Sequence, residues 1–225
     1  MDKFEENGYL FLNNVYSKDV IKNYTDLISE FLVNNNIKSH LDKRYDVKEE
    51  KFYVNNTFSS LNSFNKQQYY YLPVIDNRGS HNRTTDVGLI DIFNVHKLIP
   101  DTLKLFNIDV MINILKKITN KNWKFFRVNL QINNNVTNPN SFHFDNFEKN
   151  IKFSIYLNDI SDNSKGPLVF IEKSHNNKKN IKASNNRIFY GKEGDVLISY
   201  QNGFHKKIAQ NNYISYYLVF NFVDK

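Results

Sequence analysis

The chain has 225 residues, a formal net charge of +7 and an aromatic fraction of 15%, with 19 Phe and 14 Tyr. A chain of this length is able to bury a sizeable core as a single domain, and its aromatic residues favour a strand-rich one. Cysteine is absent, which excludes disulfides and thiolate metal sites, and no apolar run approaches the roughly 18 residues of a membrane span. The first residues are acidic and mostly polar, unlike a signal peptide, so we expect a cytoplasmic protein.

The first half of the chain is expected to contain two helices separated by irregular structure. Residues 16–36 carry apolar side chains at intervals of three and four, as one buried stripe requires, and Ser17 is the expected N-cap. Residues 35–90 are polar and irregular apart from short strand candidates such as QYYYLPV, and we expect loops there that lie over the core and shape a site. A second helix is expected after Pro100, with one apolar side formed by Val110, Met111, Ile114, Leu115 and Ile118.

The second half of the chain is expected to form strands. KFFRVNLQI and IKFSIYL alternate between apolar and mostly polar side chains, and GPLVFI, GDVLISY and YISYYLVFNFV complete a set of short strands between turn residues. Helices first and antiparallel strands after them predict an α+β fold with a jelly roll or barrel as its body. Because we find no internal repeat or linker, we expect one domain, residues 1–225. In it the helical and loop-rich residues 1–122 pack on the strand-rich residues 123–225.

One short motif, NSFHFDNF at residues 140–147, points to chemistry. Side chains alternate along an extended strand, so Ser141, His143 and Asp145 are expected on one side, with Phe142 and Phe144 on the other. This spacing places an imidazole beside a carboxylate in front of an apolar layer. The motif is either half of a metal site or a strand with one solvated face, because a lone His-x-Asp is common by chance.

His205 is the candidate third ligand. QNGFHKKI places it between the strand GDVLISY and the last strand, from where it can reach back to His143 and Asp145. Two histidines and a carboxylate on one face of a metal leave the opposite positions open, which is the arrangement of non-haem Fe(II) oxygenases. A wall of phenylalanines would keep such a reactive centre dry. A zinc hydrolase could use the same three ligands with a bound water.

Further motifs follow one another along most of the chain, from FEENGYLFLNNVYS to YYLVFNF. They include a Gly-aromatic pair, the His-x-Asp, a Leu-x-Asp after a strand, a Gly-Pro-Leu strand, a Ser-His turn, a Gly-Asp pair and the distal histidine. The residues concerned are Phe4, Gly8, Tyr9, His143, Asp145, Leu157, Asp159, Gly166, Pro167, Leu168, Ser174, His175, Gly194, Asp195 and His205. In this order the motifs resemble the phytanoyl-CoA dioxygenase-like branch of the Fe(II)/2-oxoglutarate-dependent oxygenases.

The resemblance implies a double-stranded β-helix, a cupin-like jelly roll with flanking N-terminal and central helices. It implies that His143, Asp145 and His205 bind Fe(II) and carry the catalysis, with 2-oxoglutarate and O₂ as cosubstrates. The expected activity is hydroxylation of a small organic metabolite, since the related halogenases lose the carboxylate that Asp145 keeps here. The positive net charge favours an anionic substrate. We expect the other histidines to be structural or surface residues, namely His40, His81, His96 and His175.

The sequence departs from this family at the residue that pairs with the far carboxylate of 2-oxoglutarate. The family usually has an arginine a short distance after the distal histidine, but residues 215–217 are Ser-Tyr-Tyr, and HKKIAQNNYISYYLVF contains no arginine. A hydrogen bond from a tyrosine to the carboxylate contributes about 1.5–3 kcal/mol, whereas burying the carboxylate without a counter-charge costs several kcal/mol. Another cation must therefore take the place of the arginine if 2-oxoglutarate binds.

Five polar residues are the candidates to line the cosubstrate pocket, provided that the polar faces of their strands turn inward. Arg127 and Gln131 share one strand face, Lys152 and Ser154 share another, and Lys207 lies two residues after the distal histidine. Arg127 and Lys152 are the preferred anchors for the carboxylate. The alternative is that these charges face solvent on edge strands.

Two other functions stay open from the sequence alone. A catalytically inactive relative that binds a metal or ligand would keep the jelly roll and its ligands but lack 2-oxoglutarate turnover. A nucleic-acid binder could use the basic run KSHNNKKNIK, but asparagines rather than aromatic residues separate its lysines, so we expect no nucleic-acid partner. We expect no membrane partner either. The identity of the small-molecule substrate and the oligomeric state are left open.

Overall fold

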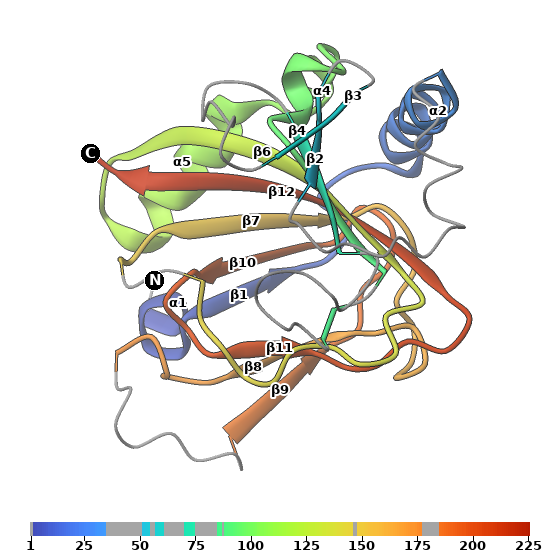
Figure 1. The fold of residues 1–225 in the computed structure, drawn as a ribbon. Helices are drawn as coiled ribbons and strands as arrows, with labels where there is room; N and C mark the ends of the chain where they lie inside the picture. Colours follow the sequence, from blue (N-terminus) through green and yellow to red (C-terminus); the bar gives the residue numbers. More distant parts are fainter. Residues whose placement is uncertain are drawn as a thin grey trace.

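The computed structural model describes residues 2–34, 51–54, 57–60, 70–74, 85–86, 88–145, 148–176 and 185–225 (Figure 1). Its helices are α1 (Asp2–Asn7), α2 (Lys18–Asn34), the short 3₁₀ helix η2 (Val95–Lys97), α4 (Thr102–Leu105) and α5 (Ile108–Thr119). Its strands are β1 (Tyr9–Leu12), β2 (Lys51–Val54), β3 (Thr57–Ser60), β4 (Tyr70–Val74), β5 (Leu89–Phe93), β6 (Trp123–Asn134), β7 (Ile151–Tyr156), β8 (Leu168–Ile171), β9 (Asn186–Phe189), β10 (Val196–Tyr200), β11 (His205–Lys207) and β12 (Ile214–Asp224).

These strands form two antiparallel sheets. The large sheet has the order β1-β10-β7-β12-β6-β5-β4-β2-β3, and the small sheet has the order β11-β8-β9 (Figure 1). Phe170 and Phe189 of the small sheet pack in one buried cluster with Leu197 and Val219 of the large sheet, so the two sheets face each other. The protein is therefore α+β, and its body is the predicted jelly roll.

The large sheet separates an apolar outer layer from a polar inner one. On β6, Val128, Leu130 and Ile132 are fully buried in the main core, which also contains side chains from α2 and α5. The residues between them face the small sheet, because side chains alternate along a strand. The helices thus bury one face of the sheet, and the other face is left to build a cavity.

The helix at residues 16–36 is confirmed as α2. It buries Ile21, Tyr24, Ile28 and Leu32, and the Ser17 hydroxyl accepts a hydrogen bond from the Val20 N–H at 3.4 Å. None of the described helices is long and apolar enough to cross a bilayer.

The helix after Pro100 is confirmed as α5, although not every residue of its predicted apolar side is buried. Met111 and Leu115 are buried, but Val110 is 51% exposed. The side chain of Asn107 caps this helix by accepting hydrogen bonds from the N–H groups of Asp109 and Val110.

Within residues 35–90 the strand candidate QYYYLPV is confirmed as β4, but the expectation of loops is wrong for residues 51–54, 57–60 and 89–90, which lie in strands. β2, β3, β4 and β5 extend the large sheet beyond β6, and QYYYLPV contributes β4. β5 pairs with β6 from Leu89 opposite Asn133 to Phe93 opposite Asn129. The large sheet is therefore wider than the sequence pattern indicated, while residues 35–50 and 75–84 lie outside the described residues.

We predict that Phe153→Ala destabilises the protein by about 3–5 kcal/mol, because this fully buried ring lies on β7 between β10 and β12 and its loss leaves a cavity. Phe126→Ala is the matched control, since that ring is 60% exposed and its loss should cost no more than about 0.5 kcal/mol. Urea unfolding measures both. Equal destabilisation by the two variants would contradict this description of the core.

Candidate metal centre

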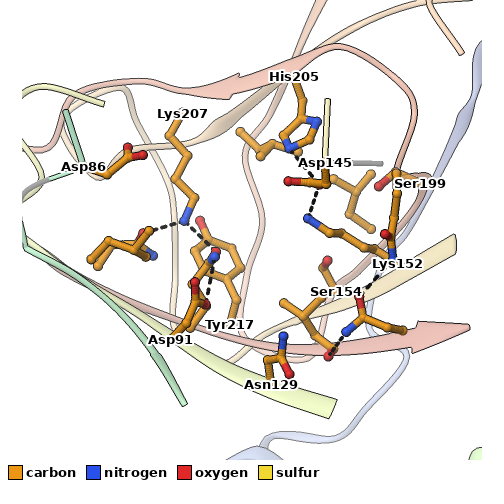
Figure 2. Close-up of a pocket in the computed structure, with 18 of the residues that line it drawn as sticks. Asp86, Asp91, Asn129, Asp145, Lys152, Ser154, Ser199, His205, Lys207 and Tyr217 are labelled. Carbon is orange, nitrogen blue, oxygen red and sulfur yellow. Dashed lines mark hydrogen bonds and ion pairs between the residues drawn. The ribbon is translucent and has the colours of Figure 1, made fainter. Parts of the chain in front are cut away.

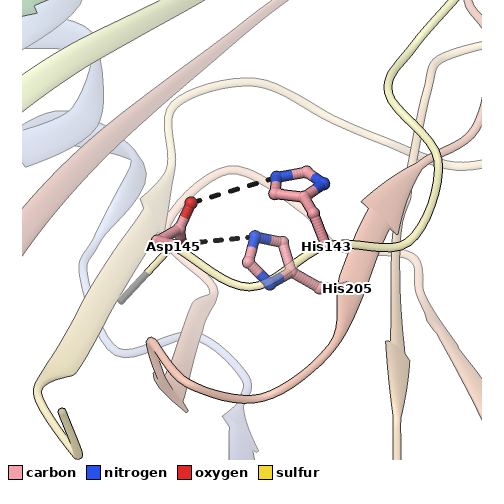
Figure 3. Close-up of side chains that lie close together, drawn as sticks. All are labelled: His143, Asp145 and His205. Carbon is pink, nitrogen blue, oxygen red and sulfur yellow. Dashed lines mark ion pairs between the residues drawn. The ribbon is translucent and has the colours of Figure 1, made fainter. Parts of the chain in front are cut away.

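Three side chains from two distant segments meet between the sheets (Figure 3). The His143 N–H donates to the His205 carbonyl at 3.0 Å, and the His205 N–H donates to the His143 carbonyl at 2.8 Å. The Asp145 N–H donates to the Gln201 carbonyl at 2.9 Å. One ligand atom from each of His143, Asp145 and His205 consequently lies within 4.8 Å of the other two. The three candidate ligands do converge.

Both histidines are oriented by a carbonyl two residues before them. Nδ1 of His143 lies 2.9 Å from the Ser141 carbonyl oxygen, and Nδ1 of His205 lies 3.0 Å from that of Gly203. Because a carbonyl only accepts, both Nδ1 atoms carry the proton and both Nε2 lone pairs are left for a metal. These Nε2 atoms face Asp145, at 3.9 Å from Oδ1 for His143 and 3.3 Å from Oδ2 for His205.

The protonation states of two of these groups suit a metal. Burial lowers the pKa of His205 to about 4, which outweighs the opposing effect of Asp145. Burial also acts to raise the pKa of Asp145, but the charge of Lys152 and its hydrogen bond hold that pKa well below its usual range. At neutral pH the imidazole is therefore neutral and the carboxylate is ionised, as a metal ligand must be.

Lys152 approaches the same carboxylate from β7. Its ammonium forms an ion pair and hydrogen bond with Oδ2 of Asp145, the oxygen that also faces His205 (Figure 2). The lysine thus supplies the positive charge that a divalent ion would bring to Asp145. An ion at this centre would compete for the carboxylate and repel the ammonium.

The apolar wall beside the ligands is not the predicted one. Residues 141–145 make only an isolated bridge rather than a strand, and neither Phe142 nor Phe144 lines the cavity next to the histidines. Phe144 packs edge-on against Phe204, with ring centroids 5.2 Å apart. Phe142 lies under the ammonium of Lys206, which is 4.8 Å from the ring centroid.

Phe170 is the ring that packs beside a candidate ligand, although it does not line the cavity either. It lies parallel to the imidazole of His205, with centroids 6.5 Å apart and an interplanar angle of 9°. Gly203 leaves room for it, because a Cβ at that position would overlap the Phe170 ring. The glycine of QNGFHKKI therefore serves close packing beside the ligand as well as the turn.

The three ligands open onto a cavity of about 520 Å³ between the sheets (Figure 2). Its floor is the inner face of the large sheet, where the strand register aligns the side chains in rows, most of them polar. One row consists of Ser199, Lys152, Asn221 and Arg127. The next row consists of Leu197, Ser154, Val219, Asn129 and Phe93. The third row consists of Tyr156, Tyr217, Gln131 and Asp91.

All five predicted cosubstrate residues line this cavity: Arg127, Gln131, Lys152, Ser154 and Lys207. The alternative, that the charges on β6 and β7 face solvent on edge strands, is wrong, because both strands lie inside the large sheet. The binding roles of the five residues remain predictions.

Lys207 enters the cavity from the small sheet. Its ammonium donates to Oε1 of Gln131 at 2.7 Å and to Oδ1 of Asn133, and it lies 5.0 Å from the ring centroid of Tyr217. Burial lowers the pKa of Lys207 to about 8, against the opposing effect of Asp91.

Asp91 is a cavity residue that sequence reasoning missed, and it lies directly after residues 35–90, where loops were expected. Its Oδ1 accepts a hydrogen bond from Gln131 at 3.2 Å. Burial raises the pKa of Asp91, although Lys207 and Gln131 act in the opposite direction. The alternation of LIDIF (residues 89–93) was the available signal for a strand with Asp91 on one face.

The other described histidines lie in different surroundings. His175 is buried, its Nε2 donates to the Glu5 carbonyl at 2.9 Å, and its ring stacks on Tyr200. His96 packs edge-on against Phe125. Neither belongs to the metal-ligand group. His40 and His81 lie outside the described residues.

No protein-family model matches the sequence, and no curated protein is significantly similar to it. Solved structures match 99% of the chain. They include the non-heme alpha ketoglutarate dependent epimerase SnoN from nogalamycin biosynthesis (TM-score 0.68, 10% identity, 80% of that chain). HygX from Streptomyces hygroscopicus, with nickel and 2-oxoglutarate bound, has a TM-score of 0.62 at 11% identity over 85% of that chain. EctD from S. alaskensis, with bound Fe, has a TM-score of 0.65 at 12% identity over 74% of that chain.

The fold is that of the phytanoyl-CoA dioxygenase-like group of Fe/2-oxoglutarate oxygenases. This confirms the fold that the motif order implied, the double-stranded β-helix of a jelly-roll oxygenase. With sequence identities this low, the likeness establishes the fold and leaves activity to the chemistry of the site.

We predict that Lys152→Met tightens divalent metal binding by about tenfold, because it removes both a competitor for Asp145 and a charge that repels the ion. Calorimetric titration with Ni(II), a redox-inert substitute for Fe(II), measures the affinity. Lys116→Met, on the exposed surface of α5, is the control and should change nothing. Weaker binding by Lys152→Met would show that the lysine helps to hold the ligands in place.

Proposed function

We propose that the chain is a non-haem Fe(II)- and 2-oxoglutarate-dependent dioxygenase that hydroxylates a small organic molecule. One observation carries this proposal: the Nε2 atoms of His143 and His205 and the carboxylate of Asp145 face one another at the wall of a polar cavity. The fold adds support, because SnoN is described as alpha ketoglutarate dependent and HygX binds 2-oxoglutarate together with nickel.

The donor set fits iron. Two imidazole nitrogens and one carboxylate on one side of an ion suit Fe(II), and no fourth His, Asp or Glu among the described residues joins the group to close the site. Bound there with 2-oxoglutarate and O₂, the iron would supply oxidative decarboxylation of 2-oxoglutarate to succinate and CO₂, with the second oxygen atom inserted into a C–H bond of the substrate. A zinc hydrolase uses similar ligands, but the fold shared with 2-oxoglutarate enzymes favours iron.

The chain itself contributes positioning and a partly dry environment. The Ser141 and Gly203 carbonyls keep the two imidazoles in the tautomer that binds metal. Leu168, Leu197 and Val219 bring apolar surface into the cavity and limit the water near the centre. The polar rows of the large sheet are then available to orient the cosubstrate and the substrate.

A metal- or ligand-binding relative without turnover is the alternative, and the lack of an arginine after His205 is the observation that favours it. This alternative requires that no lysine or arginine side chain reaches the cavity. Arg127, Lys152 and Lys207 all line it, so the dioxygenase is the better supported function.

The substrate that fits the cavity is small and organic, with an anionic group. The structures of SnoN with nogalamycin RO and of HygX with hygromycin B support a small-molecule substrate. Arg127 supports the anionic group, because its guanidinium stacks with Phe93 and Phe126, 5.1 and 5.3 Å from their ring centroids, and its buried Nε has no hydrogen-bond partner.

We predict that the wild-type protein, incubated with Fe(II) and 2-oxoglutarate without air, develops a visible metal-to-ligand charge-transfer band. On exposure to O₂ it should form succinate even without a substrate, at a slow uncoupled rate. Asp145→Ala should lose both signals because the carboxylate ligand is gone. Asp109→Ala, on the exposed first turn of α5, should keep both. A wild-type protein that binds Fe(II) but gives no band would refute the proposal.

A further inference from the structure

The anchor for the far end of 2-oxoglutarate should be a cation near the inner face of β12. That strand, Ile214–Asp224, has the sequence ISYYLVFNFVD and contains no lysine or arginine. Its cavity-facing side chains are Tyr217, Val219 and Asn221. The strand that usually carries the anchor therefore has no charge with which to hold a carboxylate.

Lys207 brings a positive charge to the same place from the opposite sheet. It lies two residues after His205 on β11, so both side chains leave the strand on one side and enter the cavity (Figure 2). The ammonium reaches across to the large sheet, where it lies 5.0 Å from the ring centroid of Tyr217 on β12 and contacts Gln131 and Asn133 on β6.

The charge of Lys207 is not neutralised by an ion pair. Its hydrogen-bond partners are two amide oxygens, and the carboxylates of Asp91 and Asp86 attract it without forming an ion pair with it among the described residues. Asp91 is linked to Lys207 only through Gln131, whose amide nitrogen donates to Asp91 and whose amide oxygen accepts from Lys207. A lysine has three N–H donors, so at least one remains for a ligand. An enclosed ammonium with no carboxylate in direct contact is costly even when Asp91 and Asp86 attract it from farther away, and an anion in contact with it would relieve that cost.

The spacing suits a five-carbon dicarboxylate. Residues i and i+2 of a strand lie about 6.7 Å apart, so Lys207 projects into the cavity one such step from the metal ligand His205. A molecule that binds the metal through its 2-oxo acid end would extend its other carboxylate by a similar length. The metal end and the distal end of 2-oxoglutarate would then be held by neighbouring inward positions of one strand.

The other two cations have different surroundings. Lys152 is already paired with Asp145, next to the metal rather than at the distal end. Arg127 lies two rows of the sheet away from Tyr217 and stacks on Phe93 and Phe126. The geometry thus favours Lys207 over Arg127 and Lys152, the anchors that the sequence had favoured.

We propose that Lys207 binds the distal carboxylate of 2-oxoglutarate and replaces, from the opposite sheet, the arginine that β12 lacks. This inference rests on the proposed function and assigns a specific residue to its cosubstrate. Gln131 and Asn133 hold the ammonium in position.

The test is an anaerobic titration of the Fe(II)-loaded protein, followed by its charge-transfer band. Two ligands are compared: 2-oxoglutarate and 2-oxopentanoate, which has the same chain length but no distal carboxylate. The wild type should prefer 2-oxoglutarate by about 100-fold, and Lys207→Met should lose most of that preference while it binds Fe(II) as before. Lys206→Met, the neighbouring lysine on the other side of the strand, should match the wild type.

A rescue variant separates a role in binding from a role in folding. Lys207→Met combined with Tyr217→Arg places the cation back on β12 and should restore at least a tenfold preference for 2-oxoglutarate. Thermal unfolding and Fe(II) affinity show whether each variant is folded, and Lys207→Gln, which removes the charge but keeps a polar side chain, serves if Lys207→Met is not.

The possible outcomes distinguish the two proposals. If the wild type binds 2-oxoglutarate and folded Lys207→Met keeps the full preference for it, Lys207 is not the anchor and the inference fails alone. If the wild type shows no charge-transfer band with either 2-oxo acid, the proposed function itself fails.

Discussion

The two backbone hydrogen bonds between His143 and His205 are the constraint on which the whole site depends. They join a segment without regular structure to a three-residue strand, and they bring together ligands that are far apart in sequence. Each bond contributes only about 1 kcal/mol of net stability. Their greater effect is geometric, because they place two imidazoles side by side and leave Asp145 to complete the group.

The inner face of the large sheet lowers the stability of the fold, because the cavity leaves polar side chains there partly without partners. Neighbouring strands there present Asn, Gln, Ser, Lys and Arg where an ordinary sandwich would bury apolar side chains. Oδ1 of Asn129 and Nε of Arg127 are buried without a hydrogen-bond partner, which costs about 1–3 kcal/mol for each group. The helices on the outer face offset this cost with a continuous apolar core. Polar groups without a partner inside the protein are available to form hydrogen bonds with a ligand.

Much of the fold and of the candidate metal centre was predictable, because both leave local patterns. Alternation along KFFRVNLQI and IKFSIYL predicted the strands, and His143, Asp145 and His205 stood at the expected places in the motif order. The errors concern contacts between elements. LIDIF carries a local signal for a strand, but it does not reveal that β5 pairs with β6 and brings Asp91 into the cavity.

One further error, the expected wall of Phe142 and Phe144, had the same origin. The aromatic neighbour of the distal histidine comes from β8, so HFDNF could not reveal that it is Phe170. The anchor of the distal carboxylate stays a prediction, and choosing among Arg127, Lys152 and Lys207 requires knowing which strands face one another across the cavity. A sequence read one element at a time does not contain that information.

The short strand β11 has a mechanical consequence. It carries His205 and Lys207 on one side and pairs with β8 over three residues. If both side chains bind the same molecule, any displacement of this strand moves the two binding groups together and leaves the distance between them unchanged. An arginine on β12 would instead tie that distance to the gap between the sheets. If so, the distance between the sheets can change to admit substrates of different size while the affinity for the cosubstrate stays the same.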